Sequence, residues 1–344
     1  MIQITVDEQF EHAAKVYCKK IYDSFSKIEK EKLNLWVKDY LLLFQKDYFE
    51  DGNNRNSYDY FFQIMIAPYE DLLAMKKYID SRYVRIKYNK EKYKIPQRRC
   101  GGQQPKYIKI DDFLINKYKS IDKKEFVKLT GIVVCPYCNR NYVNVTEEKG
   151  EKGEKGKRTY NSGTNNSQLD HFFSKSARAG GRKYPIFALS FFNLIPSCYG
   201  CNNKKGYEDF ELSPYDKRFR SDDLIIFNWQ PQPNQKSPIF SKDSITITCK
   251  VHEEFKKDFD YLNLEKNYQL HTDIVEELLW KKRIYTGTYK EKLVSNYKKI
   301  GLDMSEINRA ILGNFIEEDD YGKRPLSKMM ADIGKNIRLI GDSK

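Results

Sequence analysis

The spacing of apolar residues predicts helices at both ends of the chain. Near the start, FEHAAKVYCKKIYDSFSKI and LNLWVKDYLLLFQKDYF place apolar side chains three and four positions apart, which is the period of an amphipathic helix. Near the end, Thr272 is expected to cap a helix that carries Ile274, Val275, Leu278 and Leu279. We therefore expect a helical N-terminal region and a largely helical C-terminal region.

Shorter runs of β-branched and aromatic residues predict strands between these regions. DLIIFNW and SITITCKV are joined by the turn-rich QPQPNQKSP and should form a hairpin. NYVNV and SQLDHFF are further candidate strands, and the charged run EKGEKGEKGK (148–157) between them is expected to be a loop tip. The pattern predicts an α+β protein with a helical region over 1–95, a central module over 96–215, and a hairpin with further helices over 216–344.

Composition and charge favour a soluble protein with a polyanionic partner. The chain has 344 residues, of which 26 are Tyr and 20 are Phe, so a core can be filled without a cofactor. An excess of 61 Lys and Arg over 48 Asp and Glu gives a net charge of +13. This charge attracts nucleic acid, although a solvated surface explains it equally well. No signal-peptide pattern or membrane-length apolar run is apparent, so we expect a cytoplasmic protein with no membrane association.

One segment concentrates basic and aromatic residues. In residues 81–99, SRYVRIKYNKEKYKIPQRR, arginines and lysines alternate with tyrosines. Cations for phosphates beside rings for stacking are typical of a nucleic-acid groove, so Arg98 and Arg99 are candidate contacts. The alternative is a solvated edge strand or helix face whose tyrosines pack inward, and both interpretations stay open.

Two Cys-x-x-Cys pairs predict a structural zinc site. Cys135 and Cys138 form CPYC, and Cys198 and Cys201 form CYGC. Two residues between cysteines let both thiolates of a tight turn face one ion, and two such turns complete a tetrahedral four-sulfur site with no open position. A reducing compartment favours metal over disulfides. A redox role for one pair would leave the other pair unexplained.

An acidic residue and a histidine stand together between the two cysteine pairs, at Asp170 and His171. Neighbours on a strand point to opposite faces unless the strand ends or bends there. Taken alone, such a pair is more often a surface feature than a catalytic one. Its context is notable, because Asn193 follows in FFNLIPSC and Asn202 comes directly after the second cysteine pair.

These motifs together resemble a known family. CPYCNRNYV, LDHFFSKS and YPIFALSFFNLIPSCYGCNNKKG are similar to the ββα-metal fold of HNH endonucleases with an attached zinc knuckle, over about residues 130–210. The order of Asp-His, a central Asn and Cys-x-x-Cys-Asn-x-x-Lys matches the family pattern. The third position of that pattern is Asn202 instead of His, and its carbonyl oxygen can still bind a hard cation.

The resemblance implies a role for each matched residue. His171 would take a proton from the attacking water. Asp170 and Asn202 would hold one catalytic Mg²⁺ or Mn²⁺ at the scissile phosphate, and Asn193 would fix the orientation of the imidazole. The reaction would be phosphodiester hydrolysis that leaves 5′-phosphate and 3′-hydroxyl ends.

Three basic residues near these motifs are candidate phosphate contacts. They are Lys205, Lys175 and Arg182, and for the last two a solvated surface position is an equal alternative. DNA is the expected substrate of an HNH protein. RNA, including tRNA, stays open because the motifs contain nothing that would read a 2′-hydroxyl.

The C-terminal segment carries a second, weaker resemblance. NLEKNYQLHTDIVEELLWKKRIY and ILGNFIEEDDYGKRPLSKMMADI resemble the C-terminal region of HNH proteins from Septu-type bacterial anti-phage systems. This implies antiviral defence together with an ATPase partner related to the ABC and SMC ATPases, whereas the alternative is an amphipathic helical cap on the core. Two other functions stay open: a zinc-knuckle protein that binds nucleic acid without cutting it, and an interaction subunit that is silent until the ATPase docks.

Overall fold

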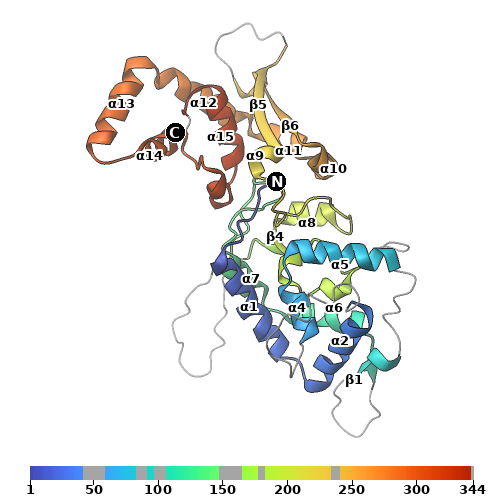
Figure 1. Cartoon of the computed structure of the whole chain (residues 1–344). Coiled ribbons are helices and arrows are strands. Elements are labelled where there is room, and N and C mark those ends of the chain that lie inside the picture. Colours follow the sequence, from blue (N-terminus) through green and yellow to red (C-terminus); the bar gives the residue numbers. More distant parts are fainter. Residues whose placement is uncertain are drawn as a thin grey trace, which may run out of the picture.

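The computed structural model arranges the chain as two groups of elements with the cysteine-rich segments between them (Figure 1). Helices from the N-terminal third form one group, and a long hairpin with the C-terminal helices forms the other. The structure describes residues 1–41, 59–82, 91–96, 106–146, 165–176, 183–233 and 241–341.

The first group is helical, as the apolar spacing predicted up to residue 95, and it continues with two helices over 110–130, where none was predicted. Two of its helices start at clear caps: the side chain of Asp7 accepts a hydrogen bond from the Phe10 amide, and Ser26 forms a capping box with Glu29. The helices of this group are α1 (Glu8–Asp23), α2 (Lys27–Tyr40), α4 (Tyr60–Ile66), α5 (Tyr69–Arg82), α6 (Ile110–Ser120) and α7 (Lys123–Thr130).

Within the described ranges, the strands form three antiparallel pairs. The long hairpin predicted from DLIIFNW and SITITCKV is confirmed, with Asn228 opposite Thr248 at its centre. The pairs are β1 (Ile95–Pro96) with β2 (Tyr107–Ile108), β3 (Gln168–His171) with β4 (Leu194–Ser197), and β5 (Ile225–Pro231) with β6 (Ile245–Val251).

The strand predicted for NYVNV is wrong. This segment forms only isolated bridges, from Val134 to Tyr142 and from Val145 to Asn165. The chain reverses around the first cysteine pair, where the Cys135 amide donates to the carbonyl of Asn141. The segment pairs with Val134 at Tyr142 and with Asn165 at Val145, so neither partner runs beside it long enough for a regular ladder.

The second group covers the long hairpin with helices. α15 packs on β5 and on α12, and the Phe227 amide donates to Asp332 at 2.8 Å. Thr272 is the first residue of α12 and not its cap, because the preceding turn Gln269–His271 already runs in helical conformation. The helices here are α9 (Ser221–Leu224), α10 (Glu253–Tyr261), α11 (Leu264–Tyr268), α12 (Thr272–Ile284), α13 (Gly287–Lys299), α14 (Met304–Leu312) and α15 (Ser327–Asn336).

Aromatic side chains fill much of the interior, as the composition predicted. Phe10, Tyr17, Phe126 and Phe191 meet edge to face or tilted between α1, α7 and the segment before β4. The buried apolar side chains form one continuous cluster, and the proposed boundaries near residues 95 and 215 stay a prediction. No helix in the described part of the chain has the length and apolar character needed to cross a membrane.

Candidate active site and cysteine cluster

A strand, a second strand and a helix follow one another around the Asp-His pair. β3 ends at His171, which lies opposite Leu194 of β4, and α8 (Tyr199–Lys205) begins directly after β4 and Cys198. Because β3 ends there, Asp170 and His171 can line the same cavity instead of facing opposite sides of a sheet. The order of these elements is ββα-like.

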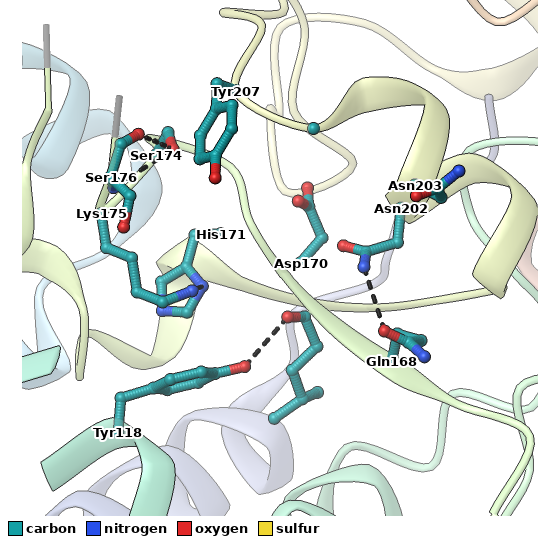
Figure 2. A pocket seen from close by; sticks show the side chains of 12 residues that line it. Tyr118, Gln168, Asp170, His171, Ser174, Lys175, Ser176, Asn202, Asn203 and Tyr207 are labelled. Atoms are coloured by element: carbon teal, nitrogen blue, oxygen red, sulfur yellow. Dashed lines mark hydrogen bonds between the residues drawn. The ribbon is translucent and has the colours of Figure 1, made fainter. Parts of the chain in front are cut away.

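A cavity of about 510 Å³ opens over the end of β3 (Figure 2). It brings together the three residues on which the sequence prediction depends most, which are Asp170, His171 and Asn202. Its lining is mostly polar and consists of Tyr118, Gln168, Leu169, Asp170, His171, Ser174, Lys175, Ser176, Asn202, Asn203, Gly206 and Tyr207.

The contacts of His171 assign one neutral tautomer to its ring. Nε2 lies 3.0 Å from the carbonyl oxygen of Ala188, which can only accept a hydrogen bond, so Nε2 carries the proton. Nδ1 lies 3.0 Å from the ammonium of Lys175, which can only donate. Burial and the charge of Lys175 lower the pKa of His171 well below its ordinary value. The imidazole therefore stays neutral, with its basic lone pair on Nδ1.

Lys175 is held on an aromatic ring beside this base. Its ammonium lies 4.4 Å from the centre of the Tyr118 ring, and that ring meets the imidazole edge to face at 4.2 Å. Lys123 approaches the Tyr118 ring as well, at 4.9 Å. Burial lowers the pKa of Lys175 to about 8. The side of the cavity next to His171 is thus cationic.

Asp170 is buried and held from two directions. The hydroxyl of Tyr137 donates to its Oδ2 at 2.6 Å, and the ammonium of Lys205 donates to Oδ1 at 3.4 Å and lies 3.3 Å from Oδ2. Burial and the nearby carboxylate raise the pKa of Tyr137 far above its usual range, so its hydroxyl keeps its proton and donates. A carboxylate offers about four acceptor positions, so a second position on Oδ1 is left for a cation beside the contact with Lys205.

Asn202 presents an oxygen to the cavity. Its amide nitrogen donates to the side-chain oxygen of Gln168 at 3.1 Å, which fixes the orientation of the amide group. Figure 2 shows the amide oxygen of Asn202 turned toward Asp170. A carboxylate and an amide oxygen are hard ligands of the kind that Mg²⁺ takes together with water and phosphate.

Asn193 holds the loop around the imidazole and does not contact the ring. Its side chain accepts from the Phe173 amide at 2.8 Å and donates to the carbonyls of Phe173 and Phe187. Phe187 directly precedes Ala188, whose carbonyl binds Nε2 of His171. The role expected for Asn193, which was to orient the imidazole, would therefore act through the backbone.

The four predicted cysteines lie together. Their sulfur atoms are all within 4.8 Å of one another, and in the described ranges they are the one group of three or more His, Cys, Asp or Glu side chains that could share an ion. Four sulfurs at about 2.3 Å from a tetrahedral zinc would be about 3.8 Å apart, and the sulfurs of Cys138 and Cys198 are 3.9 Å apart. The cluster can therefore hold zinc, as the spacing predicted.

Polar groups around the cluster stabilise thiolates. The Arg140 amide donates to the sulfur of Cys138 at 3.4 Å, and the Asn141 side chain donates to that of Cys198 at 3.4 Å. Hydrogen bonding from Cys135 lowers the pKa of Cys138 and of Cys198, whereas burial raises the pKa of Cys135 and hydrogen bonding from Cys135 raises that of Cys201. Thiolate is the form that binds zinc, so these contacts suit a metal site.

The tail motif docks on the first cysteine turn. The backbone of Asn139 is in the left-handed region, with a φ of 48°. Its side chain donates to the carbonyl of Tyr321 at 2.8 Å. The Leu326 amide donates to the Asn139 carbonyl at 2.6 Å. Lys328, in the same motif, is buried between Asp222 and Asp332. The segment from ILGNF to KRPLSK therefore packs against the first cysteine turn, next to the cluster.

One predicted phosphate contact has a different position. Lys205 is fully buried and donates to Asp170 and to the carbonyls of His171 and Phe172. It lies four residues after Cys201 and so shares the inward face of α8. Lys175 lines the cavity as described, whereas Arg98, Arg99 and Arg182 lie outside the described residues, as does most of 81–99.

Several residues of the site carry no clear signal in the sequence. Ala188 contributes only its backbone carbonyl, and Tyr118 comes from α6, a helix with an ordinary amphipathic pattern. The sequence shows that Tyr137 belongs to the CPYC turn, but nothing in it indicates that the hydroxyl contacts Asp170. No known family model, curated protein or solved structure matches the chain.

Proposed function

We propose that this chain is a metal-dependent endonuclease of the HNH type, which hydrolyses phosphodiester bonds of nucleic acid. The observation that carries the proposal is the neutral imidazole of His171, with its basic Nδ1 in the same cavity as Asp170 and Asn202. A fixed base beside hard oxygen ligands is an arrangement that can hydrolyse a phosphodiester.

The donor atoms on the cavity wall fit one Mg²⁺ or Mn²⁺ ion. Asp170 and Asn202 would hold it through a carboxylate and an amide oxygen. When bound, such an ion stabilises charge on the phosphate and on the departing 3′-oxygen. The role of Lys205 changes accordingly: it would hold Asp170 and the backbone of β3 in place, not bind the substrate.

His171 would act as the general base. Its Nδ1 would take a proton from water as the water oxygen attacks phosphorus, and the bond to the 3′-oxygen would break. The Ala188 carbonyl keeps the ring in the tautomer that leaves Nδ1 free of a proton. Lys175 would have to leave Nδ1 for this step, and the phosphate is an anion to which its ammonium could move.

A partner-dependent enzyme is a second candidate. In the structure the ammonium of Lys175 occupies the lone pair of the base, so the base is blocked until Lys175 moves. Such a contact fits a nuclease that is silent alone and is released by a partner, for which the resemblance of the tail suggests an ABC- or SMC-like ATPase in anti-phage defence. DNA is the first substrate to test, and RNA stays open.

The test is a cleavage assay with plasmid DNA, single-stranded DNA and tRNA in Mg²⁺ or Mn²⁺, with and without the product of the neighbouring gene. We expect cleavage that is lost in His171→Ala and in Asp170→Asn but retained in His252→Ala, an exposed histidine. Binding without cleavage under all conditions, unchanged in His171→Ala, would instead identify a zinc-knuckle binding protein.

A further inference from the structure

One side chain joins the cysteine cluster to the proposed catalytic carboxylate. Tyr137 lies between Cys135 and Cys138, so its backbone belongs to the first cysteine turn. Its hydroxyl donates to Oδ2 of Asp170 at 2.6 Å, and the whole residue is 1% exposed. A single residue, Tyr137, therefore connects the cysteine cluster to Asp170.

The ring of Tyr137 has little freedom to move independently of the cluster. On one side, the Ile2 amide donates to the carbonyl of Pro136 at 2.7 Å, and the Asn139 amide donates to that of Cys135 at 2.8 Å. On the other side, the ring meets Phe210 edge to face at 5.8 Å. Any change in the path of the cysteine turn would therefore displace the hydroxyl.

This hydroxyl also decides how Asp170 presents its oxygens. Tyr137 donates to Oδ2 at 2.6 Å, whereas the ammonium of Lys205 lies between the two oxygens, donating to Oδ1 at 3.4 Å and lying 3.3 Å from Oδ2. A short hydrogen bond to one oxygen of a carboxylate fixes its rotation and leaves the other oxygen for a cation. Groups that orient ligands in this way influence metal affinity strongly.

We propose that Tyr137 is a positioning residue that couples the cysteine cluster to Asp170, so that an ion bound by the cysteines sets the affinity of the carboxylate for a divalent cation. The inference rests on the proposed function, because it concerns the affinity of the divalent-cation site proposed there. Loss of the ion from the cluster would release the CPYC turn and, with it, the hydrogen bond to Asp170.

The simpler alternative is that the hydroxyl only satisfies a buried acceptor. Tyr215 provides a matched control, because it is also 1% exposed and its hydroxyl donates to the Leu194 carbonyl on β4 at 3.0 Å. Tyr137→Phe and Tyr215→Phe each remove one buried hydroxyl next to the same strand pair. Only the first removes a contact with the carboxylate.

The experiment uses the full-length, zinc-loaded protein and measures Mn²⁺ affinity by electron paramagnetic resonance. We expect Tyr137→Phe to weaken Mn²⁺ binding about 10- to 100-fold, with zinc content unchanged and with Tyr215→Phe binding Mn²⁺ like the wild type. Coupling is reciprocal, so Mg²⁺ should also tighten zinc binding, measured by competition with a chelator, in the wild type but not in Tyr137→Phe.

The outcomes separate the two proposals. If Asp170→Asn weakens Mn²⁺ binding but Tyr137→Phe does not, the coupling is wrong and the proposed metal site stands. If Mn²⁺ binding is the same in the wild type and in Asp170→Asn, the metal site of the proposed function is wrong, and the coupling falls with it. Equal losses in Tyr137→Phe and Tyr215→Phe would show a general packing effect and would also overturn the coupling.

Discussion

The ammonium of Lys175 lies 3.0 Å from Nδ1 of His171, the nitrogen that would accept the proton of the attacking water. A cation at this position has two opposite effects. It keeps the imidazole neutral, because a second positive charge there would be repelled. It also covers the lone pair, so that the base becomes available only when the lysine moves.

Replacing Lys175 with Met should make cleavage more sensitive to acid. Burial and Lys175 together lower the pKa of His171, so removal of the lysine raises that pKa toward its ordinary value of about 6.5. A larger fraction of the base is then protonated at about pH 6, and the ratio of kcat/KM at pH 6 to that at pH 8 should fall. Lys204→Met, on the exposed side of α8, should leave the ratio unchanged. An unchanged ratio in Lys175→Met would mean that this lysine does not influence the base.

Lys205→Met should destabilise the folded protein strongly. The substitution leaves the carboxylate of Asp170 without its buried counter-charge, and it removes a donor from the carbonyls of His171 and Phe172. Breaking a buried pair in this way costs about 3–5 kcal/mol, which urea unfolding at neutral pH would measure. Lys204→Met should cost little. A stability equal to that of the wild type would favour the original expectation, in which Lys205 is free to contact phosphate.

Asn193→Ala should lower both stability and cleavage. The amide group of Asn193 makes three buried hydrogen bonds to the backbone at Phe173 and Phe187, and leaving these groups unpaired should cost about 3 kcal/mol. The carbonyl of Ala188 should then lose its fixed position under His171. Thermal melting and the cleavage rate are the measurements, with the exposed Asn203→Ala as a stability control. A variant that melts like the wild type but no longer cleaves would instead place Asn193 in direct contact with the ring.

Removing one thiol of the cluster should abolish zinc binding and folding together. Elemental analysis of the purified protein should find about one zinc per chain, and Cys138→Ser should lose it, because binding of such an ion supplies folding free energy. Circular dichroism and limited proteolysis would follow the loss of structure. Cys249→Ser, on β6 and outside the cluster, should keep its zinc. A folded, zinc-free Cys138→Ser protein would show that the cluster is an ordinary group of buried thiols.

The fold could be predicted where a pattern extends over many residues. The hairpin β5–β6 and the helices of both ends follow directly from alternation and from helical spacing. The prediction was wrong at NYVNV, which follows the turn that brings Cys135 and Cys138 together and divides its pairing between Val134 and Asn165. A local propensity cannot show that a distant second cysteine pair will close that turn.

The candidate site could be predicted only through side chains that have a recognisable spacing. The cysteines, Asp170, His171 and Asn202 come together as expected. The backbone carbonyl of Ala188 has no signal in any sequence pattern. The sequence predicts Lys205 as a phosphate contact, yet the helical phase that places Cys201 in the cluster also turns Lys205 inward.

The contact between Asn139 and the tail has a consequence for synthesis of the protein. Asn139 is hydrogen-bonded to Tyr321, 182 positions further along the chain, and to the amide of Leu326. A ribosome releases the chain from its N-terminal end, so the first cysteine turn is made long before the segment that closes over it. We therefore expect the first cysteine turn of a nascent chain to lack these two hydrogen bonds, and to be held less firmly, until the segment that contains Tyr321 and Leu326 has been made.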